Sequence, residues 1–509
     1  MKYCCIVILM SLQLFASDQD SLIVATVGTH AITAGDLTTS YEFGPAFVKR
    51  TTDPLREHLK YMVYEYLLAL EGEKNGLDET DFVKSRVQGL QEDYAVEELY
   101  KQEILSKVTL SKDTVEMDIA AAKKNISLRW IYTDSKRQAV TMYNMISSTG
   151  VFDSLFTQQL SASIHPGDRS YETTLLKLER DNQDLAATVK TMHPGTVSKP
   201  IQVHDGYYII SFDSLTENPI TTQTEYAELR NQAVEIRTKI EADNLADAYI
   251  KNVMEQNYPV IKADGFNILR AYLADKGLSH DTKIQWEIPS TFMTEAGPQP
   301  ISSSEKYLSH ILVTYGKRSL QVRDFADWYD IRQFQLDTRS EKAFSSSVRR
   351  SIWKMVQDKL LSQQAYARGF DRLKSTRHET ELWKRKMLYL GERSALLRTM
   401  DLSDSVTRSF YKEHSKSYVD ANGTIKKYKD IKNEVKQDCF YSLEPVIILK
   451  KIEALKKKYP VVIHDSVLTT LSMKVRQDPH AIDAVFYKPG GTFPHVAFPT
   501  IDEAWIRFR

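Results

Sequence analysis

Few residues in this 509-residue chain have the types and spacing that catalytic or metal chemistry requires. The 12 histidines include no H-E-x-x-H run and no other pair at ligand spacing on an expected helix. The chain also has no G-x-S-x-G turn, no phosphate-binding loop and no C-x-x-C pair. The sequence therefore disfavours hydrolases, nucleotide-dependent enzymes and dithiol oxidoreductases, and it predicts no metal and no cofactor.

The stretch with the clearest organisation runs from His193 to Phe212, HPGTVSKPIQVHDGYYIISF. Pro194-Gly195 is a turn signal, and Lys199-Pro200 favours an extended chain before the next segment. After Gly206 the residues are aromatic and β-branched, which predicts a buried strand. The order of a turn, G-x-V-S-x-P, a short loop and G-Y-x-I-I resembles the C-terminal end of a parvulin-type peptidyl-prolyl isomerase domain. The alternative is an ordinary hairpin in an α+β domain.

The resemblance implies an apolar proline pocket beside a polar cluster with two histidines, and this sequence lacks both histidines. Their positions hold Trp130, in the run S-L-R-W-I, and Tyr208. The family's pocket phenylalanine maps to Leu185, and we expect Met192 to bind substrate in the same pocket. His204 is the candidate substitute, although a lone loop histidine is more often only exposed. The resemblance therefore implies no confident catalytic residue, and we expect a domain that binds proline-containing or aromatic segments with little or no isomerase activity.

Two further parts of the family's polar site are not recognisable either. The glycine pair with its acidic residue has no clear match in residues 165–169, and Ser161-Ala162-Ser163 replaces an expected acid or cysteine. Elsewhere, His310-Ile311-Leu312-Val313 spells the parvulin strand motif, but the segments that a parvulin needs do not follow it. We expect this run to belong to a repeat of the first segment of the chain. A second, truncated isomerase domain is the alternative.

Charge and the N-terminus limit the partners and the location. The 67 basic residues equal the 67 acidic ones, so the basic excess of a general nucleic-acid binder is missing. Lys2 precedes an apolar run, Cys4 to Phe15, that is too short to span a bilayer and predicts a signal peptide over residues 1–17. The alternative is an uncleaved anchor. No other stretch is long and apolar enough to cross a membrane, and the mature chain keeps a single cysteine, Cys439. An exported protein without disulfides fits the periplasm of a double-membrane bacterium.

Long amphipathic helices account for much of the remaining chain, and their order recurs. Asp53-Pro54 starts the first, whose apolar residues are spaced by three and four up to Gly76, and Asp78 is expected to cap a second. Residues near the start of the first copy match residues of the second copy at one constant separation in sequence: Gly28, Ile32, Asp36 and Leu37 match Gly316, Leu320, Asp324 and Phe325. The run N-Y-P-V from Asn257 and the run K-Y-P-V from Lys458 match at a shorter separation, so we expect an insert in the first copy.

The predicted fold class is α+β, mostly α, with a helical core present twice and a parvulin-like α/β domain inserted in the first copy. The expected order after the signal peptide is given by residue ranges: copy 1 over 18–124, the parvulin-like domain over 125–217, the closing helix of copy 1 over 218–264, a linker over 265–304, copy 2 over 305–470 and a tail over 471–509. The tail is expected to be irregular and to end in a short strand near Trp505.

This combination of elements resembles the SurA-like periplasmic chaperones and their PrsA relatives. The resemblance implies a helical cradle that holds unfolded polypeptide clients, outer-membrane proteins above all, with no integral membrane segment in the mature chain. Apolar helix residues are the candidates for lining that cradle: Tyr61, Met62, Tyr64, Tyr66, Trp353 and Met355. The alternative is that these faces only pack on each other. Two other functions stay open, an active isomerase with a rearranged site and an assembly scaffold for one folded partner.

Overall fold

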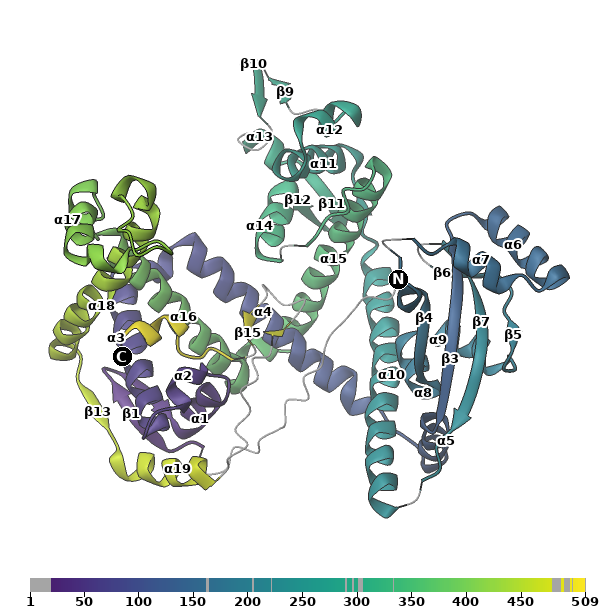
Figure 1. Cartoon of the computed structure of the whole chain (residues 1–509), viewed down its shortest axis with the longest axis horizontal. Helices are drawn as coiled ribbons and strands as arrows, with labels where there is room; N and C mark the ends of the chain where they lie inside the picture. Colours follow the sequence, from purple (N-terminus) through teal and green to yellow (C-terminus); the bar gives the residue numbers. More distant parts are fainter. Residues whose placement is uncertain are drawn as a thin grey trace. The chain divides into compact units, whose positions relative to one another are not determined.

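The computed structural model describes residues 20–508 except for a set of short gaps (Figure 1): 162–163, 204–205, 221, 289–290, 295–296, 301–304, 333, 478–486, 489–494 and 497. The predicted signal peptide, residues 1–17, lies outside the described residues. Helices dominate and the sheets are small, so the predicted fold class, α+β and mostly α, is confirmed. None of the described helices is both long and apolar enough to cross a membrane.

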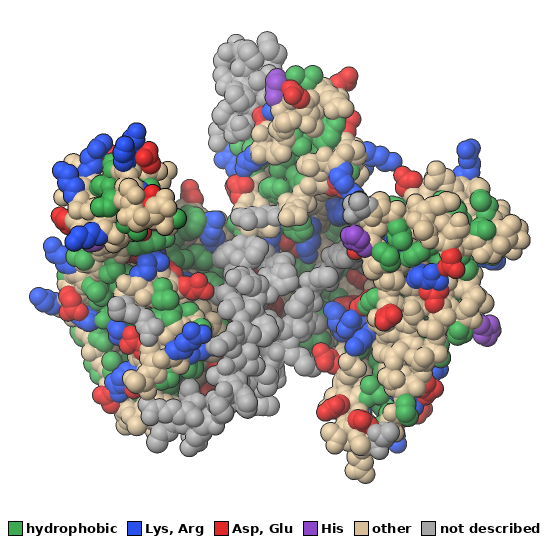
Figure 2. All heavy atoms as spheres, viewed as in Figure 1, with side chains coloured by type: hydrophobic (Ala, Val, Ile, Leu, Met, Phe, Trp, Pro, Cys, Tyr) green, Lys and Arg blue, Asp and Glu red, His purple; other side chains and the backbone are tan. Residues whose placement is uncertain are grey.

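The described chain divides into two compact units. The first, which we call the sheet unit, is a single stretch, Glu98–Tyr258. The second, the helical unit, combines the described residues on both sides of that stretch, up to Glu97 and from Pro259 onward. On the face shown in Figure 2, basic and acidic side chains are interspersed, in keeping with the balanced charge of the sequence.

The sheet unit is built on an antiparallel sheet in the order β4-β3-β7-β5, with β6 also paired to β7. Helices cover the sheet and flank it. The elements are, in order: α5 (Lys112–Ala122), β3 (Lys124–Thr133), α6 (Lys136–Thr149), α7 (Phe152–Gln158), β4 (Ser170–Thr174), α8 (Leu175–Asp181), α9 (Gln183–Lys190), β5 (Thr196–Val197), β6 (Ile201–Val203), β7 (Gly206–Glu217) and α10 (Gln223–Asn257). The strand predicted after Gly206 is therefore confirmed as β7.

The helical unit contains two three-stranded sheets, in the orders β13-β1-β2 and β12-β11-β8, and several long helices. Its N-terminal elements are β1 (Ile23–Val27), β2 (His30–Thr33), α1 (Ala34–Glu42), α2 (Ala46–Lys49), α3 (Pro54–Lys74) and the first part of α4 (Asp81–Glu103). The middle elements are β8 (Val260–Ile261), α11 (Ala263–Gly277), α12 (His280–Gln285), β11 (Ile311–Tyr315), β12 (Arg318–Gln321), α14 (Val322–Arg332) and α15 (Glu341–Ala367). The last are α16 (Lys374–Arg398), α17 (Asp404–His414), α18 (Lys432–Lys458), β13 (Val461–Ile463), α19 (Asp465–Gln477) and a 3₁₀ helix, Glu503–Phe508.

Local sequence explains most helix boundaries and misses some. The long helix predicted after Asp53-Pro54 is α3, and a left-handed Gly76 (φ 76°) follows it, a conformation that glycine adopts without strain. The second helix was predicted to be capped by Asp78, but a 3₁₀ turn occupies Leu77–Glu79 and α4 begins at Asp81. The short strand predicted near Trp505 is wrong, because that segment is the 3₁₀ helix.

Candidate functional site

The two central strands of the sheet unit carry Trp130 and Tyr208, the residues at the positions where the resemblance implies histidines. In the antiparallel register of β3 and β7, Trp130 lies opposite Ile210 and Tyr132 lies opposite Tyr208. Successive residues of a strand point to opposite faces, so Trp130 and Tyr208 share a face with Ile210. A close approach of the chain at Gly206 fixes the start of β7, because an added Cβ there would lie 2.6 Å from the carbonyl oxygen of Thr133.

That face holds one apolar cluster, formed with α8 and α9. Its buried members are Ile126, Leu128, Leu178, Ala186, Val189, Ile210 and Phe212. Four half-buried side chains that pack against it are the four that the sequence predicts to bind substrate, Trp130, Leu185, Met192 and Tyr208, and we call these four the pocket cluster. The structure thus brings the predicted residues together, while their role in binding stays a prediction.

The segment around β5, residues 195–198, is held against β7 by hydrogen bonds. Gly195 takes a left-handed conformation (φ 83°) in the predicted turn, and its N–H donates to the carbonyl of Phe212 at 2.6 Å. The Ser198 N–H donates to the carbonyl of Ile210 at 2.8 Å, and the Ser198 hydroxyl accepts the Ile210 N–H at 2.9 Å. On the other side, the Asn182 side chain accepts the Leu185 N–H at 3.0 Å and caps α9.

Arg129 is engaged in structure on the opposite face of the sheet. Arg129 binds Asp213 through two hydrogen bonds, of 2.5 and 3.0 Å, and Asp153 at 2.7 Å. Burial raises the pKa of Asp213, but hydrogen bonds from Arg129 and Ser211 outweigh burial and keep that pKa below its ordinary value. The guanidinium also lies over the ring of Phe156, 5.3 Å from its centre. Arg129 is therefore a structural cation, on the other side of the sheet from Trp130.

The remaining candidates for a polar site add no histidine to the pocket cluster in the part of the chain that the structure describes. The N–H of His165 donates to Asp168 at 2.8 Å, and both residues are exposed on a short 3₁₀ turn. Ser161 pairs with Ile164 in an isolated bridge, while residues 162–163 and His204 lie outside the described residues. The described cluster offers rings and aliphatic carbon, with the indole N–H of Trp130 and the hydroxyl of Tyr208 as its polar ends.

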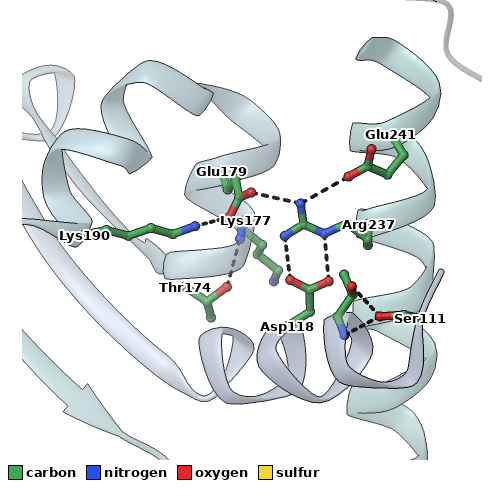
Figure 3. Close-up of polar contacts among 9 residues, drawn as sticks. Ser111, Asp118, Thr174, Lys177, Glu179, Lys190, Arg237 and Glu241 are labelled. Carbon is green, nitrogen blue, oxygen red and sulfur yellow. Dashed lines mark hydrogen bonds and ion pairs between the residues drawn. The ribbon is translucent and has the colours of Figure 1, made fainter. Parts of the chain in front are cut away.

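A buried ionic network that the sequence analysis missed holds α8 against α5 and α10 (Figure 3). Arg237 donates to both carboxylate oxygens of Asp118, at 2.8 and 2.6 Å, and to Glu179 at 3.0 Å. Lys190 binds the other oxygen of Glu179 at 2.5 Å. Burial raises the pKa of Glu179, but the hydrogen bonds from Lys190 and Arg237 outweigh it and lower that pKa overall. The only local sequence signal was the spacing of Arg237 and Glu241, which are 3.7 Å apart.

The apolar helix faces expected to line a cradle are mostly core in the helical unit. Tyr61 is fully buried, Met62 and Tyr66 are nearly so, and Met355 is fully buried. Trp353 is half-buried. The alternative, that these faces pack within the protein, therefore describes Tyr61, Met62, Tyr66 and Met355.

The C-terminal segment completes that core. Trp505 is 1% exposed and stacks on Tyr61 and Tyr389 with ring centres 5.2 and 6.1 Å apart. The indole N–H donates to Glu65 at 2.9 Å, and Lys386 binds the same carboxylate at 2.7 Å. Burial raises the pKa of Glu65, in spite of the opposing effect of Lys386. We call Tyr61, Glu65, Tyr389 and Trp505 the tail cluster.

Comparison with known proteins gives few matches. No protein-family model and no curated protein matches the chain. Among solved structures it is similar to the peptidylprolyl isomerase PrsA from Bacillus anthracis, with a TM-score of 0.22 and 16% identity over 38% of this chain and 96% of that chain. PrsA from Bacillus subtilis gives a TM-score of 0.17 and 16% identity over 46% and 93%. The foldase protein PrsA from Lactococcus lactis gives 0.21 and 13% over 46% and 93%. At these TM-scores the likeness decides neither the fold nor the activity of this chain.

Proposed function

We propose that the chain is a chaperone of the SurA and PrsA type that binds unfolded exported polypeptides in the periplasm, outer-membrane proteins among them. Its parvulin-like domain, residues 125–217, binds chain segments without isomerising them. One observation carries the proposal: Trp130 and Tyr208 stand where the resemblance places two histidines, and with Leu185 and Met192 they pack against one buried apolar cluster. Such a surface favours proline rings and aromatic side chains of an extended peptide.

The chemistry of isomerisation argues against catalysis by this cluster. Rotation about a peptide bond has a barrier of about 18–20 kcal/mol, and a catalyst must interact better with the twisted amide than with the planar one. The pocket cluster offers few polar groups that could stabilise the twisted amide more than the planar one, so we expect affinity with little acceleration. The pocket cluster therefore supports binding more than it supports turnover.

An isomerisation assay on a proline tetrapeptide, with the full-length protein, tests the loss of catalysis. We expect no acceleration above the uncatalysed rate. A rate within about tenfold of an active parvulin, or about 1.4 kcal/mol in barrier, would refute this part of the proposal and favour the rearranged active site. In that case His204→Gln becomes the first variant to assay.

Two variants sharpen the same test. Tyr208→His alone should stay inactive, because a polar cluster acts as a unit and the partner position still holds an indole. Trp130→His combined with Tyr208→His should be the first variant to gain measurable activity. Activity in the single variant would mean that the remaining half of the polar site is already present.

A pull-down from the periplasm separates chaperone from scaffold. We expect many substoichiometric unfolded clients, enriched in outer-membrane proteins, and a loss of clients when Trp130→Ala and Tyr208→Ala are combined. One folded partner recovered in equal amount, with or without those changes, would favour the scaffold. Tryptophan fluorescence should also change when proline- and aromatic-rich peptides are added to the wild-type protein.

A further inference from the structure

The helical unit contains the same series of elements twice. β1, β2 and α1 recur as β11, β12 and α14, and both hairpins have an irregular register between the first and third residues of their first strand. The long helices that follow, α3 and α15, each lead to a left-handed glycine, Gly76 (φ 76°) and Gly369 (φ 77°), and then to a single 3₁₀ turn. A shared irregularity and a shared glycine conformation are the kind of detail that a common ancestral core explains.

The third strand of each sheet comes from the other copy. β1 of the first copy pairs with β13 of the second, with Ala25 opposite Ile463. β11 of the second copy pairs with β8 of the first, with Val313 opposite Ile261. Figure 1 shows the first of these pairings directly, since purple β1 and yellow-green β13 lie side by side although they come from opposite ends of the sequence.

The backbone hydrogen bonds show that the two exchanged pairings are equivalent. The N–H of His464, just after β13, donates to the carbonyl of Val24 at 2.8 Å. In the other sheet the N–H of Lys262, just after β8, donates to the carbonyl of Leu312 at the same distance. Val24 and Leu312 are both the second residue of their strand, so the two closing strands dock in the same register.

Helix packing follows the same exchange. α3 of the first copy packs against α16, α18 and α19 of the second, with Glu71 bound to Lys451 at 3.2 Å. α11 of the first copy packs against β11, α14 and α15 of the second, with Arg270 bound to Glu341 at 2.8 Å. Gly265 allows the close contact of α11 with β11, because an added Cβ would lie 2.3 Å from a carbonyl oxygen of that strand.

We propose that the helical unit is a covalently joined, strand-exchanged pair of cores. One core, which we call core A, combines residues 20–76 with 371–508. The other, core B, combines residues 78–97 and 259–288 with 305–369. The open edge of each hairpin is thus a docking surface, and its partner is the closing strand of the other copy. This inference goes beyond the proposed function and does not depend on it.

The exchange has a consequence for the order of folding during synthesis. The hairpin of core A lies at the start of the chain, while the strand and helices that complete it lie at the end. Core A therefore cannot close until the last residues have been delivered, whereas every segment of core B is available earlier. The tail cluster belongs to core A, so Trp505 reaches its slot last.

A cleavable linker tests the proposal in the full-length protein. We insert a protease site between Pro300 and Glu305, cut the folded protein, and measure its mass in solution and its helical circular dichroism. The two fragments, 1–300 and 301–509, should stay together with unchanged helicity, because each core needs strands from both. Separation into two folded species would overturn the proposal.

Pairs of introduced cysteines distinguish exchanged strands from fragments that only associate. In the cut protein, Ala25→Cys with Ile463→Cys, and separately Ile261→Cys with Val313→Cys, should join the fragments on oxidation, shifting two bands to one on a non-reducing gel. Opposed residues of paired strands have the Cα separation that a disulfide needs. The unexchanged combinations, Ala25→Cys with Ile261→Cys and Val313→Cys with Ile463→Cys, are the controls; each pair lies within one fragment, so thiol titration reads them, and both thiols should stay free. The single variants, which retain Cys439, set the background. Disulfides in the controls but not in the first pairs would overturn the exchange.

Discussion

The tail cluster and the pocket cluster are built from the same kinds of side chain and differ in what surrounds them. Trp505 is 1% exposed, and its N–H ends on a carboxylate that itself has a lysine partner. Trp130 is half-buried at the border of its apolar cluster. An aromatic ring that is enclosed and hydrogen-bonded contributes to stability, whereas one that is half enclosed keeps a surface for a ligand.

Aromatic composition alone therefore does not mark a binding site. Tyr61 was a candidate for lining a client groove, yet it is fully buried beneath Trp505. A cavity of about 30 Å³ lies beside the described part of the tail, bordered by Glu65 and Thr500. A client segment therefore has no room in the tail cluster while the tail is in place, and we look for binding in the pocket cluster.

The largest effect on stability is expected from Trp505→Ala. The change removes a buried indole and leaves a cavity, which costs about 3–5 kcal/mol of the free energy of unfolding. Glu65 also loses one of its hydrogen-bond donors. Chemical denaturation followed by circular dichroism measures the loss. Trp505→Phe, which keeps most of the apolar burial, is the control and should lose less. A loss below about 1 kcal/mol for the alanine variant would mean that the tail is not part of the core.

The place of Trp505 could not be predicted from the sequence, and the reason is the range of its contacts. The strand of the pocket cluster follows from a local run of aromatic and β-branched residues, and α3 follows from local spacing. Trp505 meets Tyr61 and Glu65 across most of the chain, and the segment before it has no periodicity to suggest burial. The partners of Arg237, and the pairing of β13 with β1 and of β8 with β11, could not be predicted for the same reason.

The next largest effect is expected from Arg237→Ala in the sheet unit. The buried carboxylate of Asp118 would lose its two hydrogen bonds from Arg237, and Glu179 would keep only Lys190, at a cost of about 3 kcal/mol in the free energy of unfolding. Arg237→Lys should recover only part of it, since an ammonium cannot make the two-pronged contact. Lys239→Ala, on the same helix, removes an exposed pair with Asp243 at 3.5 Å and should cost less than about 0.5 kcal/mol. Equal losses for the two alanine variants would contradict this account.

Acid should destabilise the core beside the tail through His58. This side chain is fully buried, its Nε2 lies 2.9 Å from the Ser40 hydroxyl, and burial lowers its pKa to about 3, with help from Lys386 and Lys49. The unfolded chain binds a proton at His58 at a higher pH than the folded chain does. The contribution of neutral His58 to the free energy of unfolding is therefore fully present above pH 6.5 and falls by about 1.4 kcal/mol per pH unit as the pH drops toward 3. Denaturation curves at several pH values give the free energy of unfolding as a function of pH. For His58→Gln, this free energy should fall less steeply with acid than for the wild type. An unchanged slope would assign the acid sensitivity to other groups.

The smallest effect on stability, and the most informative about binding, is expected from Trp130→Ala. The ring is half-buried, so its removal should cost only about 1–2 kcal/mol, less than a fully buried tryptophan. Affinity for a proline- and aromatic-rich peptide should nevertheless fall at least about tenfold, which corresponds to 1.4 kcal/mol of binding free energy. Trp505→Phe should show the reverse pattern, lower stability with unchanged affinity. Calorimetric titration of both variants with one peptide measures the difference. If Trp130→Ala binds like the wild type while Trp505→Phe does not, the assignments of the two clusters must be exchanged, and the tail would then be the segment that clients displace.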